Sequence, residues 1–175
     1  MVGDLLDSSK IESGNLELRL EECDARIIVQ DAFNLFSSAS KSHQFTLHLP
    51  ATATPIHCDR LRIEQVLNNL VSNAIKYSPG GGQVALSLAQ AGEEALFHVS
   101  DEGMGIPRDE IPYIFEPFRR TRTAREAVPG VGLGLSVAQR IVRAHGGRIQ
   151  VESQIGKGTR FSVYLPAVQS QRASA

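Results

Sequence analysis

Two pairs of closely spaced strand patterns place the strongest constraint on the fold of this chain. Residues 83–90 and 94–100 form one pair around Ala91-Gly92, and residues 148–153 and 159–165 form another around a glycine turn. Strands joined by so few residues pair as antiparallel hairpins. The second half of the chain is therefore expected to build much of an antiparallel sheet.

Three amphipathic helical patterns accompany these strands. They run from about Ala25 to Ser38, from Asp59 to about Tyr77, and over residues 133–145. Asp24 and Asp59 are suited to cap the first two helices. The other expected elements are strands at 15–22 and 45–49, a turn from Pro50 to Pro55, a short helix at 108–116 and a polar loop at 119–131. This order predicts a two-layer α/β sandwich, in which a mixed, mostly antiparallel sheet is covered on one face by three helices.

Composition excludes several classes of protein. The chain has 175 residues and a net charge of −1, so no global field favours nucleic acid or an anionic membrane. No apolar run approaches the roughly 18 residues of a membrane span, and we expect no direct membrane contact by this chain. Cys23 and Cys58 fit no metal-ligand spacing. We read them as two isolated thiols, which suits a reducing compartment.

The helix that ends near Tyr77 carries an unusual polar face. At about 100° per residue, one arc is apolar and another gathers three amides and two cations with no acid. The members of the polar arc are Arg62, Gln65, Asn69, Asn73 and Lys76. An amide oxygen can ligate Mg²⁺ and an amide nitrogen or a lysine can bind phosphate. The alternative is an ordinary solvated face that happens to lack acids.

Two glycine segments also suggest a ligand. DEGMGI (101–106) follows a strand, where an aspartate can accept a hydrogen bond from an exocyclic amine; alternatively the segment is a simple turn. PGVGLGL (129–135) puts bare backbone N–H groups at a helix start, which favours an anion, although a flexible hinge has the same composition. Arg119 and Arg120 precede it and are suited to closing over a triphosphate.

Taken in order, these motifs resemble one family. An Asn-x3-Asn-x2-Lys-Tyr helix, DxGxGI, IFEPF (114–118) and GxGLGL resemble the motif series of the ATP-binding catalytic domain of bacterial sensor histidine kinases. These domains have the Bergerat fold, with a mobile ATP lid, and belong to the GHKL ATPase superfamily with gyrase-type and HSP90-type enzymes. The resemblance implies that residues 1–13 end a dimerisation hairpin helix, that 14–166 form the catalytic domain and that 167–175 are a flexible tail.

The resemblance also implies roles for individual residues. Asn73 would ligate Mg²⁺, Asn69 would support that site or bind phosphate, and Lys76 and Arg120 would contact phosphate, so that Asn69, Lys76 and Arg120 are the catalytic candidates. Asp101 would accept the adenine amino group, and Phe115 and Phe118 would anchor the lid. The remaining ATP-binding candidates are Tyr77, Gly103, Gly105, Ile106, Gly130, Gly132, Leu133, Gly134, Leu135 and Thr159. Val131 stands where the family often has threonine, which removes one hydroxyl contact.

No histidine of this chain fits the phosphoacceptor pattern, in which Glu or Asp follows the histidine. The five are His43, His48, His57, His98 and His145, all of which we read as structural or surface residues. The resemblance therefore implies an acceptor on an upstream dimerisation domain, a response regulator as partner, a homodimer in the full-length protein and a cytoplasmic location. It also implies signal transduction in a two-component system, with the chain acting as a transferase.

Two alternatives remain. A gyrase-type or HSP90-type ATPase would need a glutamate on the helix to activate water, and Asn69 occupies that position. A degenerate, nucleotide-sensing module would be expected to have lost some of the motifs.

Overall fold

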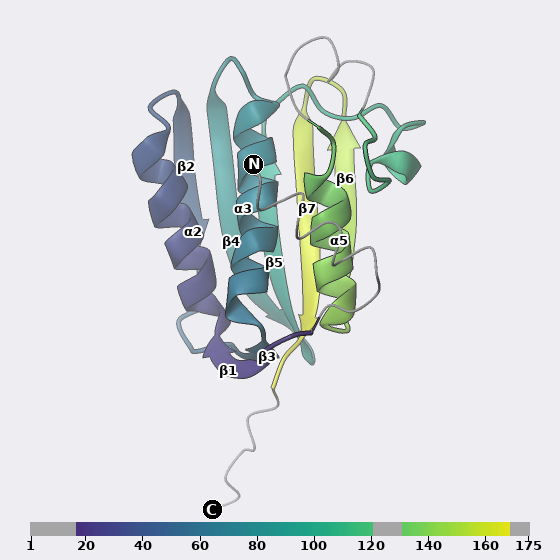
Figure 1. Ribbon diagram of the computed structural model, residues 1–175. Coiled ribbons are helices and arrows are strands. Elements are labelled where there is room, and N and C mark those ends of the chain that lie inside the picture. The colour runs from purple at the N-terminus through teal and green to yellow at the C-terminus, as the bar shows by residue number, and fades with distance from the viewer. Residues whose placement is uncertain (1–16, 121–130, 169–175) are drawn as a thin grey trace, which may run out of the picture.

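The computed structural model describes residues 17–120 and 131–168, which form two layers (Figure 1). One layer is a sheet with the strand order β2-β4-β5-β7-β6. Its strands are β2 (His43–His48), β4 (Gly82–Ala91), β5 (Glu94–Asp101), β6 (Arg148–Gln154) and β7 (Gly158–Pro166). The other layer consists of α2 (Ala25–Ala39), α3 (Arg60–Lys76) and α5 (Gly134–Ala144), side by side on one face. The predicted sandwich is confirmed.

Strand pairing also agrees with the prediction. The β4–β5 and β6–β7 hairpins are antiparallel, β5 and β7 join them side by side, and only β2 runs parallel to its neighbour β4. Along β4, Val84, Leu86 and Leu88 are buried against the helices, and the residues between them are more exposed. This period of two gives the sheet one apolar face, and the helices cover that face.

The helices start and pack as their sequences predict. Asp24 and Asp59 cap α2 and α3 by accepting the backbone N–H groups of Arg26 (3.0 Å) and Arg62 (3.2 Å). His145, at the end of α5, accepts the Asp59 N–H through Nε2 at 3.0 Å, which confirms its structural role. The whole apolar arc of α3 is buried, namely Ile63, Val66, Leu67, Leu70, Val71 and Ala74. Its polar arc is therefore left facing the surface between α3 and α5.

A two-stranded ribbon below the sheet was not predicted correctly. It pairs β1 (Glu21–Asp24) with β3 (Pro55–Cys58), so the strand expected at 15–22 lies further along the chain and β3 was missed. A four-residue strand next to a proline-bounded turn is too short for a periodic signal. The ribbon brings Cys23 and Cys58 together, with their Sγ atoms 2.9 Å apart, so the two thiols are not isolated.

Two smaller expectations also need correction. The helix predicted at 108–116 is only a 3₁₀ turn, η1 (Ile111–Tyr113), because a proline inside it cannot donate the hydrogen bond of an α-helix. Ala167 and Val168, expected in a flexible tail, donate backbone hydrogen bonds to Glu93 (2.8 Å) and Pro55 (2.9 Å). The proposed domain boundaries at 1–13 and most of the predicted loop at 119–131 lie outside the described residues. Within those residues, no helix has the length and apolarity to cross a membrane.

Candidate nucleotide-binding site

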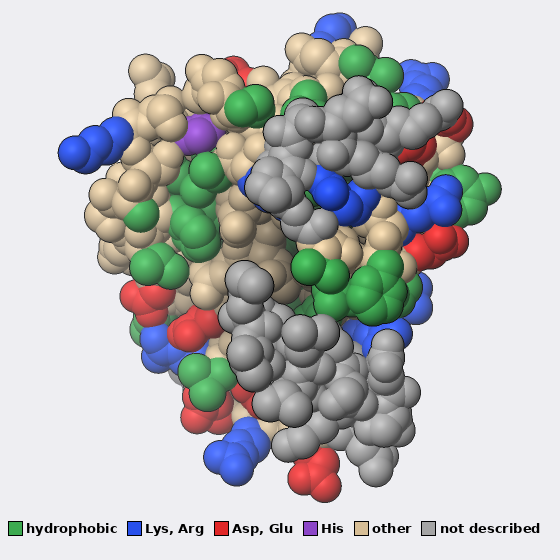
Figure 2. All heavy atoms as spheres, turned by 45° about the horizontal axis from the view of Figure 1, so that its top comes forward, with side chains coloured by type: hydrophobic (Ala, Val, Ile, Leu, Met, Phe, Trp, Pro, Cys, Tyr) green, Lys and Arg blue, Asp and Glu red, His purple; other side chains and the backbone are tan. Residues whose placement is uncertain are grey.

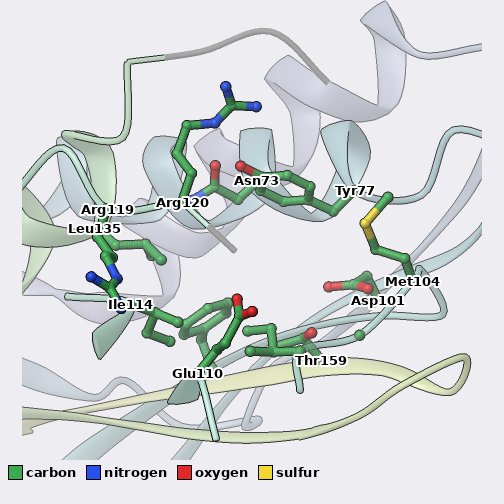
Figure 3. Close-up of a pocket in the computed structure, with 13 residues that line it drawn as sticks. Asn73, Tyr77, Asp101, Met104, Glu110, Ile114, Arg119, Arg120, Leu135 and Thr159 are labelled. Atoms are coloured by element: carbon green, nitrogen blue, oxygen red, sulfur yellow. The ribbon is translucent and has the colours of Figure 1, made fainter. Parts of the chain in front are cut away.

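Two connected cavities lie beside the polar arc of α3. The first, which we call the deep cavity, reaches from α3 to the ends of β5 and β7 (Figure 3). The second, the α5 cavity, lies between α3 and the start of α5. The residues that line both are Asn73, Tyr77, Ile114, Arg119 and Leu135, so the two cavities form one continuous site. In Figure 2, Lys or Arg side chains lie near the centre of this face, and side chains of both charges lie along its outline.

The end of the deep cavity is formed by Asp101 and Thr159, which lie opposite each other in the β5–β7 register. Asp101 accepts the backbone N–H of Gly103 at 2.8 Å. Burial raises the pKa of Asp101 above its usual value, and hydrogen bonds from the backbone of Gly103 and Thr159 oppose the shift only in part. The carboxylate of Asp101 is thus a desolvated hydrogen-bond acceptor. Keeping it ionised costs free energy unless a ligand donates a hydrogen bond to it.

The glycine turn after β5 lies between the backbone at the end of α3 and the backbone of the β6–β7 turn. Met104 donates its N–H to Tyr77 O (3.0 Å) and receives Gly156 N–H on its own carbonyl (2.9 Å). Gly105 has a φ of +69°, and a Cβ on it would lie 2.1 Å from the carbonyl oxygen of Gln154. Only glycine fits this approach, which is the reason for the second glycine of DEGMGI. Gly103 lines neither cavity and acts through its hydrogen bond to Asp101.

The polar arc of α3 forms one wall of the α5 cavity. Gln65, Asn69, Asn73 and Lys76 all line it, as their helical spacing predicts. The Lys76 ammonium lies 5.3 Å from the ring centre of Tyr77. Burial, and then the positive charge of Arg120, lower the pKa of Lys76. The positive charges of Lys76 and Arg120 therefore act on each other in partly desolvated surroundings. Such surroundings favour binding of an anion.

The start of α5 differs from those of α2 and α3 in its capping. Its N-cap residue is Leu133, and no side chain of the described residues caps it, although aspartates cap the other two helices. The first N–H groups of α5 have no partner within the helix and point out of its end. Asn69 reaches across from α3 and donates Nδ2 to the carbonyl oxygen of Gly134 at 3.3 Å. The amide side chains of α3 and the first backbone N–H groups of α5 thus line the same cavity.

The remaining predicted residues are distributed as follows. Gly132, Leu133, Gly134, Leu135 and Val131 line the α5 cavity; Gly105, Ile106, Arg120 and Leu135 line the deep cavity; Gly130 lies outside the described residues. Figure 3 shows Arg120 beside Asn73, across the cavity from Thr159.

The two phenylalanines of IFEPF have different environments. Phe115 packs against the core. Phe118 is 62% exposed, so its side chain does not anchor by packing. Its backbone has the left-handed φ of 61° instead, and its N–H donates to Gly132 O at 3.0 Å.

Sequence reasoning missed several lining residues. Met104, Glu110, Ile114 and Phe161 line the deep cavity and were given no binding role. Arg119, which the sequence suggested could close over a triphosphate, lines both cavities. Met104 could have been found, since it lies between the two glycines of a segment already expected to meet the ligand. Ser153 was also missed, although its hydroxyl accepts the N–H of Ile106 at 2.8 Å.

The arrangement defines a class of protein, an α/β sandwich in which a helix start without a side-chain cap in the described residues lies beside a pocket that ends in a buried carboxylate. Residues 58–169 match the family described as histidine kinase-, DNA gyrase B- and HSP90-like ATPase. The chain is 37% identical over 175 residues to the sensor histidine kinase WalK of Bacillus subtilis, covering 98% of this chain and 29% of WalK. It is 36% identical over 168 residues to the alginate biosynthesis sensor protein KinB of Pseudomonas aeruginosa, covering 95% of this chain and 28% of KinB.

Solved structures agree with the sequence comparisons. Full-length ShkA in complex with AMPPNP matches with a TM-score of 0.83 and 28% identity, over 97% of this chain and 35% of ShkA. The mycobacterial sensor histidine kinase MprB matches with a TM-score of 0.75 and 27% identity, over 86% of this chain and 99% of that one.

The chain belongs to the histidine kinase-, DNA gyrase B- and HSP90-like ATPase family, and within it to the ATP-binding catalytic domains of sensor histidine kinases. The predicted family is confirmed, and ATP is its expected nucleotide. The chain spans less than a third of the length of WalK and of KinB.

Proposed function

We propose that this chain binds ATP with Mg²⁺ and presents the γ-phosphate to a histidine on an upstream dimerisation domain, as one step of two-component signal transduction. The observation that carries the proposal is the start of α5, which no side chain of the described residues caps and which faces the amide and lysine side chains of α3 across one cavity. A triphosphate supplies the acceptor oxygens that these N–H groups lack.

The donor set of the site suits magnesium better than a metal bound by protein ligands alone. The described residues contain no cluster of three or more His, Cys, Asp or Glu side chains that could hold an ion. Mg²⁺ keeps most of its waters and is held in kinases by few protein oxygens together with phosphates. Asn73 lines both cavities, and its amide oxygen would be one such ligand. When bound, the ion would neutralise phosphate charge.

The chain's own residues then act by positioning and by charge. Asp101 and Thr159 orient the base, and the backbone from Gly132 to Leu135 holds the phosphates. Lys76 and Arg120 stabilise negative charge during transfer. Asn69 keeps the start of α5 against α3 through its bond to Gly134 O. Phosphoryl transfer needs little more than such positioning and electrostatic stabilisation, provided that another domain brings the nucleophile.

The finer assignments belong to the same proposal. The partners would be the chain's own upstream phosphoacceptor domain and the receiver domain of a response regulator, in a full-length homodimer. This chain itself would lie in the cytoplasm. The names of WalK and KinB identify those proteins as sensors, and the proposal extends this to the present chain.

A phosphotransfer assay tests the proposal directly. The purified chain is mixed with its upstream hairpin and labelled ATP, and acid-labile phosphohistidine is measured. We expect label on the hairpin and none when its histidine is replaced by alanine. If the hairpin carries no label while ATP is still hydrolysed, the result would favour the ATPase alternative. ATP binding without either reaction would favour the nucleotide-sensing module.

A further inference from the structure

The hydroxyl of Ser153 joins three groups at the end of the deep cavity. It accepts the Ile106 N–H at 2.8 Å, lies 2.9 Å from the Gly158 carbonyl oxygen and lies 2.9 Å from Thr159 Oγ1. Ser153 and Thr159 are direct partners in the β6–β7 hairpin. The contact therefore links a strand outside the cavity to a hydroxyl that lines it.

The number of hydrogens available to the Ser153 hydroxyl decides which group donates in each of these hydrogen bonds. A serine hydroxyl has one hydrogen to donate, and the Gly158 carbonyl can only accept. The single arrangement that satisfies all three contacts has Ser153 donating to Gly158 O and accepting from both Ile106 N–H and Thr159 O–H. The hydrogen of Thr159 then points at Ser153, and only the lone pairs of Thr159 Oγ1 remain for the cavity.

We infer that Ser153 is a positioning residue that sets the nucleobase preference of the site through Thr159. Figure 3 shows Thr159 and Asp101 at the same end of the cavity. The carboxylate of Asp101 accepts, and Thr159 held by Ser153 accepts too. When both acceptors face the 6-position, they suit a purine that carries an amine there, because its two hydrogens can donate to both. They disfavour a purine with a 6-carbonyl, because that oxygen finds no donor. The inference rests on the proposed function, since it requires a purine nucleotide in this cavity.

The ratio of two dissociation constants measures this preference. Inosine triphosphate differs from ATP only at the edge of the base that carries the 6-position. In Ser153→Ala the Thr159 hydroxyl is released and can turn to donate to the 6-carbonyl. We expect the ratio of the inosine triphosphate constant to the ATP constant to fall by roughly 3- to 10-fold, the worth of one hydrogen bond. The lost Ile106 contact weakens both nucleotides alike and cancels in the ratio.

Three further variants separate positioning from stability. Ser153→Thr keeps the hydroxyl and is expected to keep the wild-type ratio. Ser162→Ala is the matched control, since Ser162 is likewise hydrogen-bonded on the sheet, to His98 at 2.9 Å, but lines neither cavity. Ser153→Cys replaces Ser153→Ala if that variant does not fold, because its thiol fills the space but forms only weak hydrogen bonds.

The outcomes are distinguishable by titration calorimetry on the wild-type chain and the variants. A wild-type ratio in Ser153→Ala or Ser153→Cys would overturn the inference, and so would an equal fall in Ser162→Ala. Either of these results leaves the proposed function intact, provided that the wild-type chain still binds ATP more tightly than inosine triphosphate. If the wild-type chain binds neither nucleotide, the proposed function fails and this inference fails with it.

Discussion

A Gly105→Ala substitution would place a methyl group against the backbone of the β6–β7 hairpin. The added Cβ would lie 2.1 Å from the carbonyl oxygen of Gln154 and 2.6 Å from its carbonyl carbon. Both atoms belong to the backbone, so no side-chain rotation relieves the contact. Either the glycine turn or the hairpin must move, and Gly105 lines the deep cavity between them.

Gly92 provides a matched control for the backbone conformation. Its φ is +63°, close to the +69° of Gly105, but a Cβ there meets nothing within 4 Å. Gly92→Ala should therefore carry only the left-handed penalty, about 1–2 kcal/mol. Gly105→Ala adds overpacking of about 1–3 kcal/mol. At roughly 2–4 °C per kcal/mol for a domain of this size, Gly105→Ala should melt roughly 2–12 °C below Gly92→Ala.

Thermal unfolding followed by circular dichroism, together with ATP titration, measures both effects. We expect Gly105→Ala to weaken ATP binding as well, because the turn carries Met104 and Ile106 into the cavity. Gly92→Ala should bind ATP as the wild type does. Equal melting temperatures for the two variants would refute the steric argument, and unchanged ATP affinity in Gly105→Ala would remove the turn from the binding site.

Three other perturbations test separate parts of the molecule. Because burial raises the pKa of Asp101, its acceptor form is lost at a higher pH than for an ordinary carboxyl, so ATP affinity should fall as the pH falls through that raised value. Asp101→Asn should lose roughly 10-fold or more in ATP affinity and should lack this pH dependence, and a variant that keeps it would contradict the assignment. Cys23 and Cys58, with Sγ atoms 2.9 Å apart, should exchange with oxidised glutathione to one internal disulfide and two reduced glutathione molecules. Mass spectrometry should show a loss of two hydrogen atoms, slowly because burial raises the pKa of both thiols and faster at alkaline pH; a stable mixed disulfide would argue against the pair. Asp59→Ala should lower the free energy of unfolding by about 1–2 kcal/mol, because Asp59 caps α3 and also accepts the Arg19 N–H at 3.0 Å; unchanged denaturant midpoints would be inconsistent with that role.

Local patterns allowed the fold to be predicted where they were long enough. The six apolar positions of α3 recur over about three turns, and the two hairpins alternate around glycine turns, so both were found without tertiary information. β3 spans four residues beside a proline turn and carries no period of its own. The pairing of Cys23 with Cys58 depends on β3, so it was missed for the same reason.

The residues of the candidate site that face the ligand could be predicted from the sequence. The residues that hold them in position could be predicted less well. Asn73 and Asp101 stand in motifs with a chemical reading, and both line the deep cavity. Ser153 acts through a cross-strand contact, and an exposed-looking serine in a strand has no distinguishing pattern. The exposed Phe118, with its left-handed backbone, also looks in the sequence like an ordinary core phenylalanine.

The central claim is that the amide face of α3 and the start of α5 hold one magnesium triphosphate. Titration calorimetry of Asn73→Ala against ATP, with Mg²⁺ and with a chelator, tests it most directly. Ser72→Ala is the control, since Ser72 is the exposed neighbour of Asn73 on α3 and lines neither cavity. We predict that Asn73→Ala weakens binding of ATP with Mg²⁺ roughly 10-fold or more, a change of about 1.4 kcal/mol, and changes metal-free binding much less. Equal losses with and without the metal would contradict the claim.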